Sequence, residues 1–285
     1  MSEFFKPKTV KECIDLLDQY GSKAMIVNGG TDAVEKINTG KAQPEAVILM
    51  TEMKELKKIT VKDGAVHVGG AVTYLQMLKN AEIKKNQGMM IAVGAIGSPP
   101  VRVMATPAGN VGTAAPSADC TTMLMGSDAK IHVVSKKEGE RVIPIDKFFV
   151  KTYVNVLKPE DLITEVEFPA MQPGMGSGYV RLTRRKVQDI GKVLVSATIE
   201  VKRGRCTKAV IGLGALNATA VRAYSVEEAL VGLSRKEAQE FCRSGLPKEA
   251  GLRPSRYTHY KEITTPVALE RAVMMAWDQA EGKVK

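Results

Sequence analysis

The first forty residues combine a helical pattern with a short strand. Apolar side chains recur at helical spacing within residues 9–21, on a face made of Val10, Cys13, Ile14, Leu16 and Leu17. The pattern predicts a helix that ends at Gly21, because glycine is common at helix C-termini. Residues 23–37 then read as a buried strand, a Gly-Gly turn and a second helix that begins near Asp32.

Strand patterns follow. Residues 45–50 form an apolar run of strand length, and residues 59–73 alternate on both sides of an Asp-Gly turn, which predicts a hairpin. Residues 128–149 predict two more strands joined by a polar turn, and residues 162–169 predict one further strand. Between them, residues 89–125 are rich in Gly, Ala and Pro and show no clear period.

A cluster of Pro, Gly and Met at residues 169–178 predicts a domain boundary. Beyond it, residues 178–186 and 192–216 read as long antiparallel strands, and residues 265–280 as a closing helix. The expected fold class is α+β. The expected division is a first domain over residues 1–171, with subdomains of about 1–57 and 58–171, and a C-terminal domain over residues 172–285.

Composition supports a globular protein and argues against several classes. The chain has 285 residues, of which 44% are hydrophobic and 25% charged, and it contains no apolar run of the roughly 18–20 residues that span a bilayer. The N-terminus carries an acid and several lysines without an apolar segment, so we expect no signal peptide and a cytoplasmic location. The four cysteines form no CxxC, which argues against a zinc ribbon or a local iron–sulfur cluster.

The net charge of +10 raises the question of a nucleic-acid partner. The basic residues are dispersed and aromatic residues make up only 5%, so no stacking platform for bases is evident. We therefore expect no nucleic acid. An anionic cofactor or an acidic partner protein explains the charge equally well.

Common catalytic motifs are absent from the sequence. It contains no P-loop, no GxGxxG at the start of a helix, no HExxH and no GxSxG. The histidines His67, His132 and His259 are far apart, and the first two fall in predicted strands, where we read them as structural residues. We expect no metal site in this chain.

Three segments carry candidate chemistry. In residues 27–33 (VNGGTDA), backbone N–H groups at a helix start suit a phosphate, although Gly-Gly turns before helices are also common structural features. In residues 105–120, hydroxyl, amide and carboxylate side chains stand among small residues, so the segment either holds a ligand or is a packed crossing with Asp119 capping a helix. In residues 179–193, basic residues precede Asp189, either as a solvated strand face or as part of a site.

The order of these segments, NGGTD, then IGSPPVR…ATPAGN…APSAD, then RRK..DIGKV, resembles the FAD-binding subunits of the molybdenum hydroxylases. That family includes xanthine dehydrogenase, carbon monoxide dehydrogenase, nicotinate dehydrogenase and aldehyde oxidase. Residues 96–119 follow the family pattern IGSxQIRNxATIGGNIxxASPxxD without a gap. The resemblance implies a vanillyl-alcohol-oxidase (PCMH)-type FAD domain of two subdomains, followed by an α+β domain like that of the carbon monoxide dehydrogenase flavoprotein.

The resemblance also implies the residues that contact FAD. The loop that holds the pyrophosphate would comprise Ile26, Val27, Asn28, Gly29, Gly30, Thr31, Asp32 and Ala33. The phosphate and ribityl contacts would come from Thr106, Gly109, Asn110, Thr113 and Asp119. Ile96 would lie near the isoalloxazine, Ile163 near the adenine or the dimethylbenzene edge, and Arg181 where a family lysine often meets the flavin.

One departure from the family pattern affects this set. Pro107 and Ala108 stand where the family commonly has Ile-Gly. Proline lacks an N–H group and alanine resists positive φ, so we expect FAD to bind with a shifted set of hydrogen bonds there.

The implied function is electron transfer. In similar complexes a large subunit hydroxylates a purine, another N-heterocycle or an aldehyde at molybdopterin. A small subunit with two [2Fe–2S] clusters passes the electrons to FAD, which delivers them to NAD or another acceptor. The alternative is a stand-alone flavin reductase or oxidase of the same fold, for which Ser196 and Tyr179 are the candidate proton donors.

Overall fold

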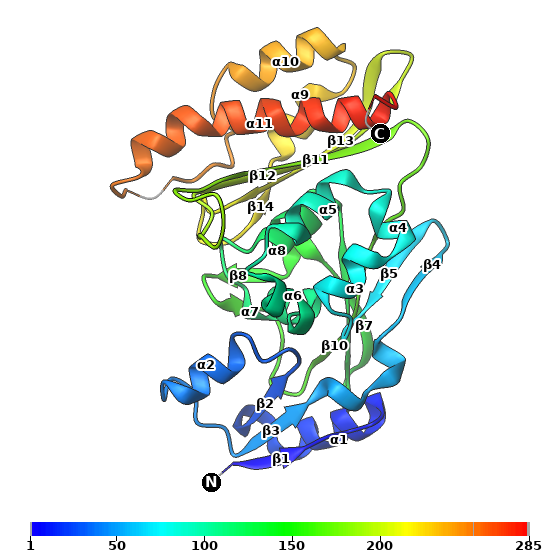
Figure 1. Ribbon diagram of the computed structural model, residues 1–285, viewed down its shortest axis with the longest axis vertical. Helices are drawn as coiled ribbons and strands as arrows, with labels where there is room; N and C mark the ends of the chain where they lie inside the picture. The colour runs from blue at the N-terminus through cyan, green and yellow to red at the C-terminus, as the bar shows by residue number, and fades with distance from the viewer. Residues whose placement is uncertain (1, 253, 284–285) are drawn as a thin grey trace.

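The computed structural model describes residues 2–252 and 254–283. Figure 1 shows three units stacked along the longest axis, with the N-terminal residues at one end and the C-terminal helices at the other. Each unit is built on its own β-sheet. In the part of the chain that is described, no helix has both the length and the apolar character needed to cross a membrane.

The N-terminal unit is a small parallel sheet with two helices. Its strands lie in the order β1 (Glu3–Phe5), β3 (Ala46–Leu49) and β2 (Ala24–Val27), and its helices are α1 (Val10–Tyr20) and α2 (Ala33–Asn38). The predicted helix α1 is present: the Thr9 hydroxyl accepts the Glu12 N–H at its start, and Gly21, with φ +50°, ends it. The 3₁₀ turns η1 (Gly21–Lys23), η2 (Met50–Glu52) and η3 (Lys54–Leu56) complete the unit.

The middle unit contains a five-stranded antiparallel sheet. Its order is β4 (Ile59–Lys62), β5 (Ala65–Gly69), β10 (Leu162–Pro169), β6 (Lys130–Ser135) and β7 (Gly139–Pro144). Both predicted hairpins are confirmed, with β4 paired to β5 and β6 paired to β7. Strand β10 lies between the two hairpins, so the sheet is complete only when β10, its last strand in the sequence, pairs with β5 and β6.

Six helices connect β5 to β6 and cover the apolar face of this sheet (Figure 1). They are α3 (Tyr74–Lys79), α4 (Ala81–Lys84), α5 (Gln87–Gly94), α6 (Pro99–Met104), α7 (Pro107–Thr113) and α8 (Asp119–Met125). Residues 105–120, which show no clear helical period in the sequence, are thus helical over α7 and at the start of α8. Pro107 occupies the first position of α7, where its fixed φ suits the helix and its missing N–H has no helical partner to lose.

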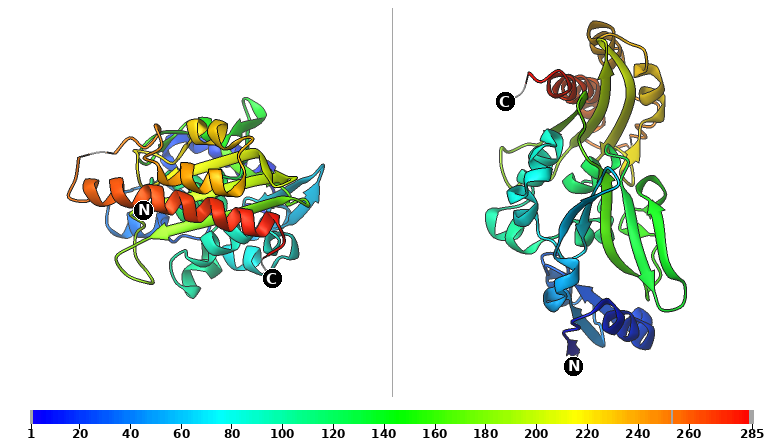
Figure 2. Two further views of the ribbon diagram at one scale, coloured as in Figure 1. Left: turned by 90° about the horizontal axis from the view of Figure 1, so that it is seen from above. Right: turned by 90° about the vertical axis from the view of Figure 1, so that its right-hand side faces the viewer.

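The C-terminal unit is an antiparallel sheet between two sets of helices. Its strands follow the order β11 (Met175–Leu182), β12 (Val193–Lys202), β13 (Arg205–Gly214) and β14 (Val221–Arg222). One face packs on α9 (Tyr224–Leu230), α10 (Arg235–Arg243) and α11 (Thr258–Ala280), which crosses the sheet in Figure 2. The other face contacts α5 and α8 of the middle unit. An added Cβ at Gly178 would lie 2.0 Å from the Ala272 carbonyl oxygen of α11, so glycine permits this close packing.

The remaining elements are short. The 3₁₀ turn η4 (Ile145–Lys147) and the two-stranded pair of β8 (Phe149–Lys151) and β9 (Val154–Asn155) join β7 to β10.

The basic segment after β11 is a loop, where the sequence predicted a strand continuing to residue 186. The strand ends at Leu182 because the Asp189 carboxylate accepts the backbone N–H groups of Arg184, at 2.8 Å, and Arg185, at 3.1 Å. Burial opposes ionisation of this carboxyl, but these hydrogen bonds prevail and lower the pKa of Asp189 to about 2. The loop is thus folded around one buried charge.

Candidate functional site

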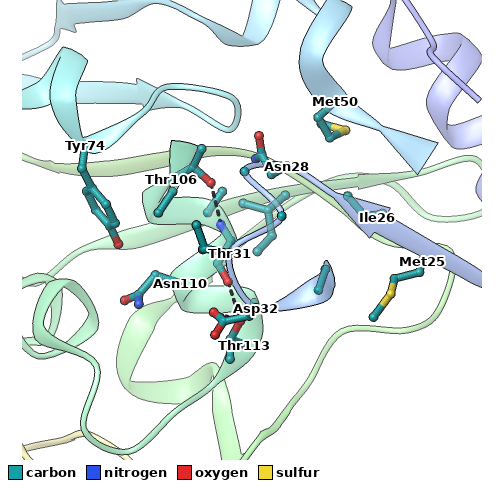
Figure 3. Close-up of a pocket in the computed structure, with 18 of the residues that line it drawn as sticks. Met25, Ile26, Asn28, Thr31, Asp32, Met50, Tyr74, Thr106, Asn110 and Thr113 are labelled. Carbon is teal, nitrogen blue, oxygen red and sulfur yellow. Dashed lines mark hydrogen bonds between the residues drawn. The ribbon is translucent and has the colours of Figure 1, made fainter. Parts of the chain in front are cut away.

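A cavity of about 520 Å³ lies between the N-terminal and middle units (Figure 3). This volume is in the range of small-molecule and cofactor sites. Its lining comes from the loop after β2, from α7 and from the start of β10, with single residues from α3 and α6. The lining residues include no histidine, cysteine or glutamate, so the cavity offers few groups for acid–base chemistry.

The loop after β2 presents a row of backbone donors to this cavity. Within the described residues, no hydrogen bond uses the N–H groups of Gly29, Gly30, Thr31 or Asp32 as donor. The left-handed φ of Gly30, +72°, turns the chain at this point. Consecutive unpaired N–H groups at a ligand cavity suit the oxygens of an anion such as a pyrophosphate.

This loop is fixed by contacts on both sides. An added Cβ at Gly29 would lie 1.9 Å from the Met104 carbonyl oxygen, so the loop packs directly on the end of α6. The Asn28 amide donates to the Gly70 carbonyl oxygen, just after β5. The donors are therefore held in place before any ligand arrives.

Helix α7 forms the opposite wall of the cavity. The Thr106 hydroxyl caps it by accepting the Gly109 N–H at 3.0 Å, and the Thr113 hydroxyl donates to the Gly109 carbonyl oxygen at 2.9 Å (Figure 3). The side-chain oxygen of Asn110, Oδ1, accepts from the Thr121 N–H, at 3.3 Å, and from the Thr121 hydroxyl, at 3.1 Å. In the described parts of the chain, the NH₂ group of Asn110 has no partner, which leaves it as a donor for a ligand.

The sequence analysis missed Tyr74, which lines the same cavity. Tyr74 is fully buried, and among the described residues its hydroxyl makes no hydrogen bond to an oxygen or nitrogen atom, although the thiol of Cys120 lies beside it as a weak partner. Burial raises the pKa of Tyr74 well above its usual range, so the hydroxyl stays protonated. Because a thiol is a weak hydrogen-bond partner, the hydroxyl is left as a donor for a ligand in the cavity. Tyr74 gave no signal in the sequence, since it looks like any core residue of a helix.

The structure brings most of the predicted residues to this one cavity. Those that line it are Ile26, Asn28, Gly29, Gly30, Thr31, Asp32, Ala33, Ile96, Thr106, Gly109, Asn110, Thr113 and Ile163. Val27, Asp119 and Arg181 do not line it.

Asp119 and Arg181 instead form a buried pair that joins α8 to β11. The Arg181 Nε lies 2.8 Å from an Asp119 carboxylate oxygen, and the Tyr179 hydroxyl donates to the same oxygen at 2.8 Å. Burial raises the pKa of Asp119 above its usual range, although Arg181 and Tyr179 oppose this. The Asp119 carboxylate makes no capping hydrogen bond to α8, so the capping alternative is not what the structure has.

Ser196 and Tyr179, the candidate proton donors of a stand-alone enzyme, are both buried and hydrogen-bonded within the protein. The Ser196 hydroxyl is fully buried and donates to the Thr122 carbonyl oxygen at 2.6 Å. Burial raises the pKa of Tyr179 well above its usual range, and its hydroxyl is bonded to Asp119. Neither residue lines the cavity, so neither is placed to give a proton to a molecule bound there.

Comparison with known families identifies the fold. The family model described as "FAD binding domain in molybdopterin dehydrogenase" matches residues 1–171, and "CO dehydrogenase flavoprotein C-terminal domain" matches residues 178–244. The structure of carbon monoxide dehydrogenase from Hydrogenophaga pseudoflava superposes with a TM-score of 0.88 at 24% identity, over 98% of both chains. Quinoline 2-oxidoreductase from Pseudomonas putida 86 gives 0.87 at 21% identity, again over 98% of both.

Two curated relatives agree with this assignment. The FAD subunit of nicotinate dehydrogenase from Eubacterium barkeri is 30% identical over 236 residues, covering 81% of this chain and 79% of the relative. The medium chain of carbon monoxide dehydrogenase from Hydrogenophaga pseudoflava is 31% identical over 185 residues, or 64% of each chain. The resemblance and the α+β fold predicted from the sequence are confirmed: the chain belongs to the FAD-binding subunits of the molybdenum hydroxylases.

Proposed function

We propose that this chain binds FAD in the cavity between its first two units and carries electrons within a three-subunit oxidoreductase. Electrons would arrive from two [2Fe–2S] clusters in a small partner subunit, which are reduced by a molybdopterin subunit, and would leave to NAD or another acceptor. Bound FAD supplies the chemistry of accepting and passing on electron pairs. The chain's own residues would bind and orient it.

The observation that carries the proposal is the row of unpaired N–H groups from Gly29 to Asp32 at the cavity wall. A pyrophosphate is the part of FAD that such a row fits, because its oxygens are charged acceptors. Lys36 of α2 also lines the cavity and adds a positive charge.

The opposite wall suits the less charged parts of the cofactor. Among the described residues, the NH₂ group of Asn110 makes no hydrogen bond and the Tyr74 hydroxyl has the weak Cys120 thiol beside it, and Figure 3 shows both side chains on the same side of the cavity. Ribityl hydroxyls and flavin carbonyls accept such bonds. Pro107, at the first position of α7, has no N–H group to offer, so the hydrogen bonds to FAD there would be shifted relative to those of the family.

We also propose how the whole chain divides into domains. Residues 1–171, with subdomains of about 1–57 and 58–171, would form the FAD-binding domain, and residues 172–285 a domain that packs on it. Asp119 stays a candidate for the phosphate and ribityl contacts, Arg181 for contact with the flavin, and Val27 for the loop that holds the pyrophosphate. The substrate class, a purine, another N-heterocycle or an aldehyde, would belong to the large partner subunit.

The direct test is to purify the full chain, record its absorbance and identify any flavin that heat releases. We expect FAD in a 1:1 ratio, or uptake of added FAD by flavin-free protein. FMN or riboflavin in place of FAD would show that the N–H row does not select a pyrophosphate. A chain that binds no flavin would refute the proposal.

The partner proposal needs a separate test. The chain would be co-expressed with the proposed small and large partner subunits and purified through a tag on the large one. We expect all three to elute together and a reducing substrate of the large subunit to bleach the flavin. Bleaching that fails while the complex stays intact would argue against this electron path.

A further inference from the structure

A second cluster of functional side chains lies on the outer face of the middle sheet, away from the FAD cavity. His67 on β5, His132 on β6 and the pair Glu165 and Glu167 on β10 share that face, because β10 runs between the two histidine strands. The register places Glu167 opposite His67 and Glu165 opposite His132. The opposite face of these strands packs in the core.

The polar atoms of this cluster lie close together. His67 Nδ1 is 2.5 Å from a Glu165 carboxylate oxygen, and His132 Nε2 is 3.8 Å from that same oxygen. One ligand atom from each of these three residues lies within 4.8 Å of the other two. The side chains are between 16% and 30% exposed, so they are held by their surroundings yet open to solvent.

These separations are close to those of a first-row metal centre. Metal–nitrogen and metal–oxygen distances of about 2.0–2.2 Å place the ligands of a tetrahedral Zn²⁺ roughly 3.3 Å apart. The atoms of His67, His132 and Glu165 lie on either side of that value, a difference that small side-chain rotations supply. Two imidazoles and one carboxylate are a common donor set for Zn²⁺ and its neighbours.

The charges at the cluster favour a cation. Lys130 lies 2.9 Å from one oxygen of Glu167 and neutralises that carboxylate. Among the described residues, Glu165 forms ion pairs only with the two histidines.

We propose that His67, His132 and Glu165 bind one divalent transition-metal ion of the Zn²⁺ type. His132 Nε2 forms a hydrogen bond with a Glu167 oxygen at 2.7 Å in the metal-free chain, and the ion would take the place of that proton. The fourth position would then be filled by water or by Glu167, whose other oxygen is held by Lys130. The ion would join β5, β10 and β6 across the sheet. This site is separate from the FAD cavity and does not depend on the proposed function.

The test uses the untagged full chain, freed of metal by a chelator and dialysis. Zn²⁺ is titrated against a chromophoric chelator, and Co²⁺ is then used to report geometry through its visible absorption. We expect one high-affinity equivalent, tetrahedral Co²⁺ bands, and a melting temperature that rises with Zn²⁺. The four cysteines are buried, so they do not compete.

Two variants and one control locate the ion. His132→Ala and Glu165→Gln should each weaken Zn²⁺ binding about 100-fold or more, since loss of an outer-shell partner alone costs 10- to 100-fold. Glu165→Gln keeps the size of the side chain and serves if His132→Ala does not fold. His259→Ala removes a histidine that is 86% exposed in its side chain and lies on α11, and it should bind as the wild type does.

Wild-type binding no tighter than that of Glu165→Gln would overturn the proposal. So would loss of the ion in His259→Ala, because it would place the metal on the surface of α11.

Discussion

Replacing Gly29 with alanine perturbs the proposed FAD loop by a single methyl group. The new Cβ would lie 1.9 Å from the carbonyl oxygen of Met104 and 2.4 Å from its carbonyl carbon. Cβ atoms essentially never approach closer than 3.0 Å, so the loop must move by about 1.1 Å, the difference between 3.0 and 1.9 Å. Side-chain rotation cannot relieve the contact because both atoms are backbone.

The expected loss follows from this displacement. A shift of about 1 Å takes an N–H group out of the hydrogen-bonding range of roughly 2.7–3.2 Å. A hydrogen bond to a charged acceptor contributes about 1.5–3 kcal/mol, so the loss of one bond weakens FAD binding about 10- to 150-fold. Stability should fall by a further ~1–3 kcal/mol, as is typical of overpacking.

The assay is titration of FAD into the flavin-free full chain, read by quenching of flavin fluorescence, with circular dichroism to confirm folding. Gly94→Ala is the matched control. It adds the same methyl group at the end of α5, where nothing lies within 4 Å and φ is not positive. Gly94→Ala should bind FAD normally. A folded Gly29→Ala protein with wild-type affinity would refute the assignment of the loop to FAD.

Three further predictions follow from single side chains. Tyr74→Phe should change the stability of the flavin-free chain little in chemical unfolding, because the buried hydroxyl that it removes has only a weak thiol partner, while FAD affinity falls about tenfold. Unchanged affinity would mean that the hydroxyl does not face FAD. Burial raises the pKa of all four cysteine thiols, to about 11 for Cys206 and about 12 for the other three, so they stay protonated at pH 8. The native chain should therefore resist iodoacetamide, whereas the unfolded chain should react at four sites. Prompt modification of the native chain would contradict this. Since hydrogen bonds lower the pKa of Asp189 below its unfolded value, its stabilisation is present above about pH 4 and lost as the pH falls to about 2. The Arg184 and Arg185 amide NMR signals of the native chain should therefore shift around pH 2, and should not do so in Asp189→Asn.

Local signals explain what the sequence predicted well. The helix at residues 10–20 and the hairpins of the middle sheet depend on neighbouring residues, and each was found in place. The glycine loop was also recognisable, because Gly29 and Gly30 follow a strand and precede a helix. The helical form of residues 107–113 was missed because small residues and a proline mask the helical period, although Thr106 and Pro107 fit a helix start.

What the sequence could not predict depends on which strands pair. The insertion of β10 between β5 and β6 alone brings Glu165 to His67 and His132, which stand far apart along the chain. Tyr74 became a candidate only once its buried hydroxyl was found at the cavity with no oxygen or nitrogen partner among the described residues. The strand predicted through residue 186 ends early because the Asp189 carboxylate accepts hydrogen bonds from the backbone N–H groups of Arg184 and Arg185.

The central position of β10 also affects the order in which the chain can fold during synthesis. When the ribosome has released residues 1–161, β5 and β6 are complete, but each has one edge with unpaired N–H and C=O groups. Those edges stay open until residues 162–169 emerge and pair with both strands at once. The nascent chain therefore passes through a state with two exposed strand edges, the kind of surface that chaperones shield from aggregation.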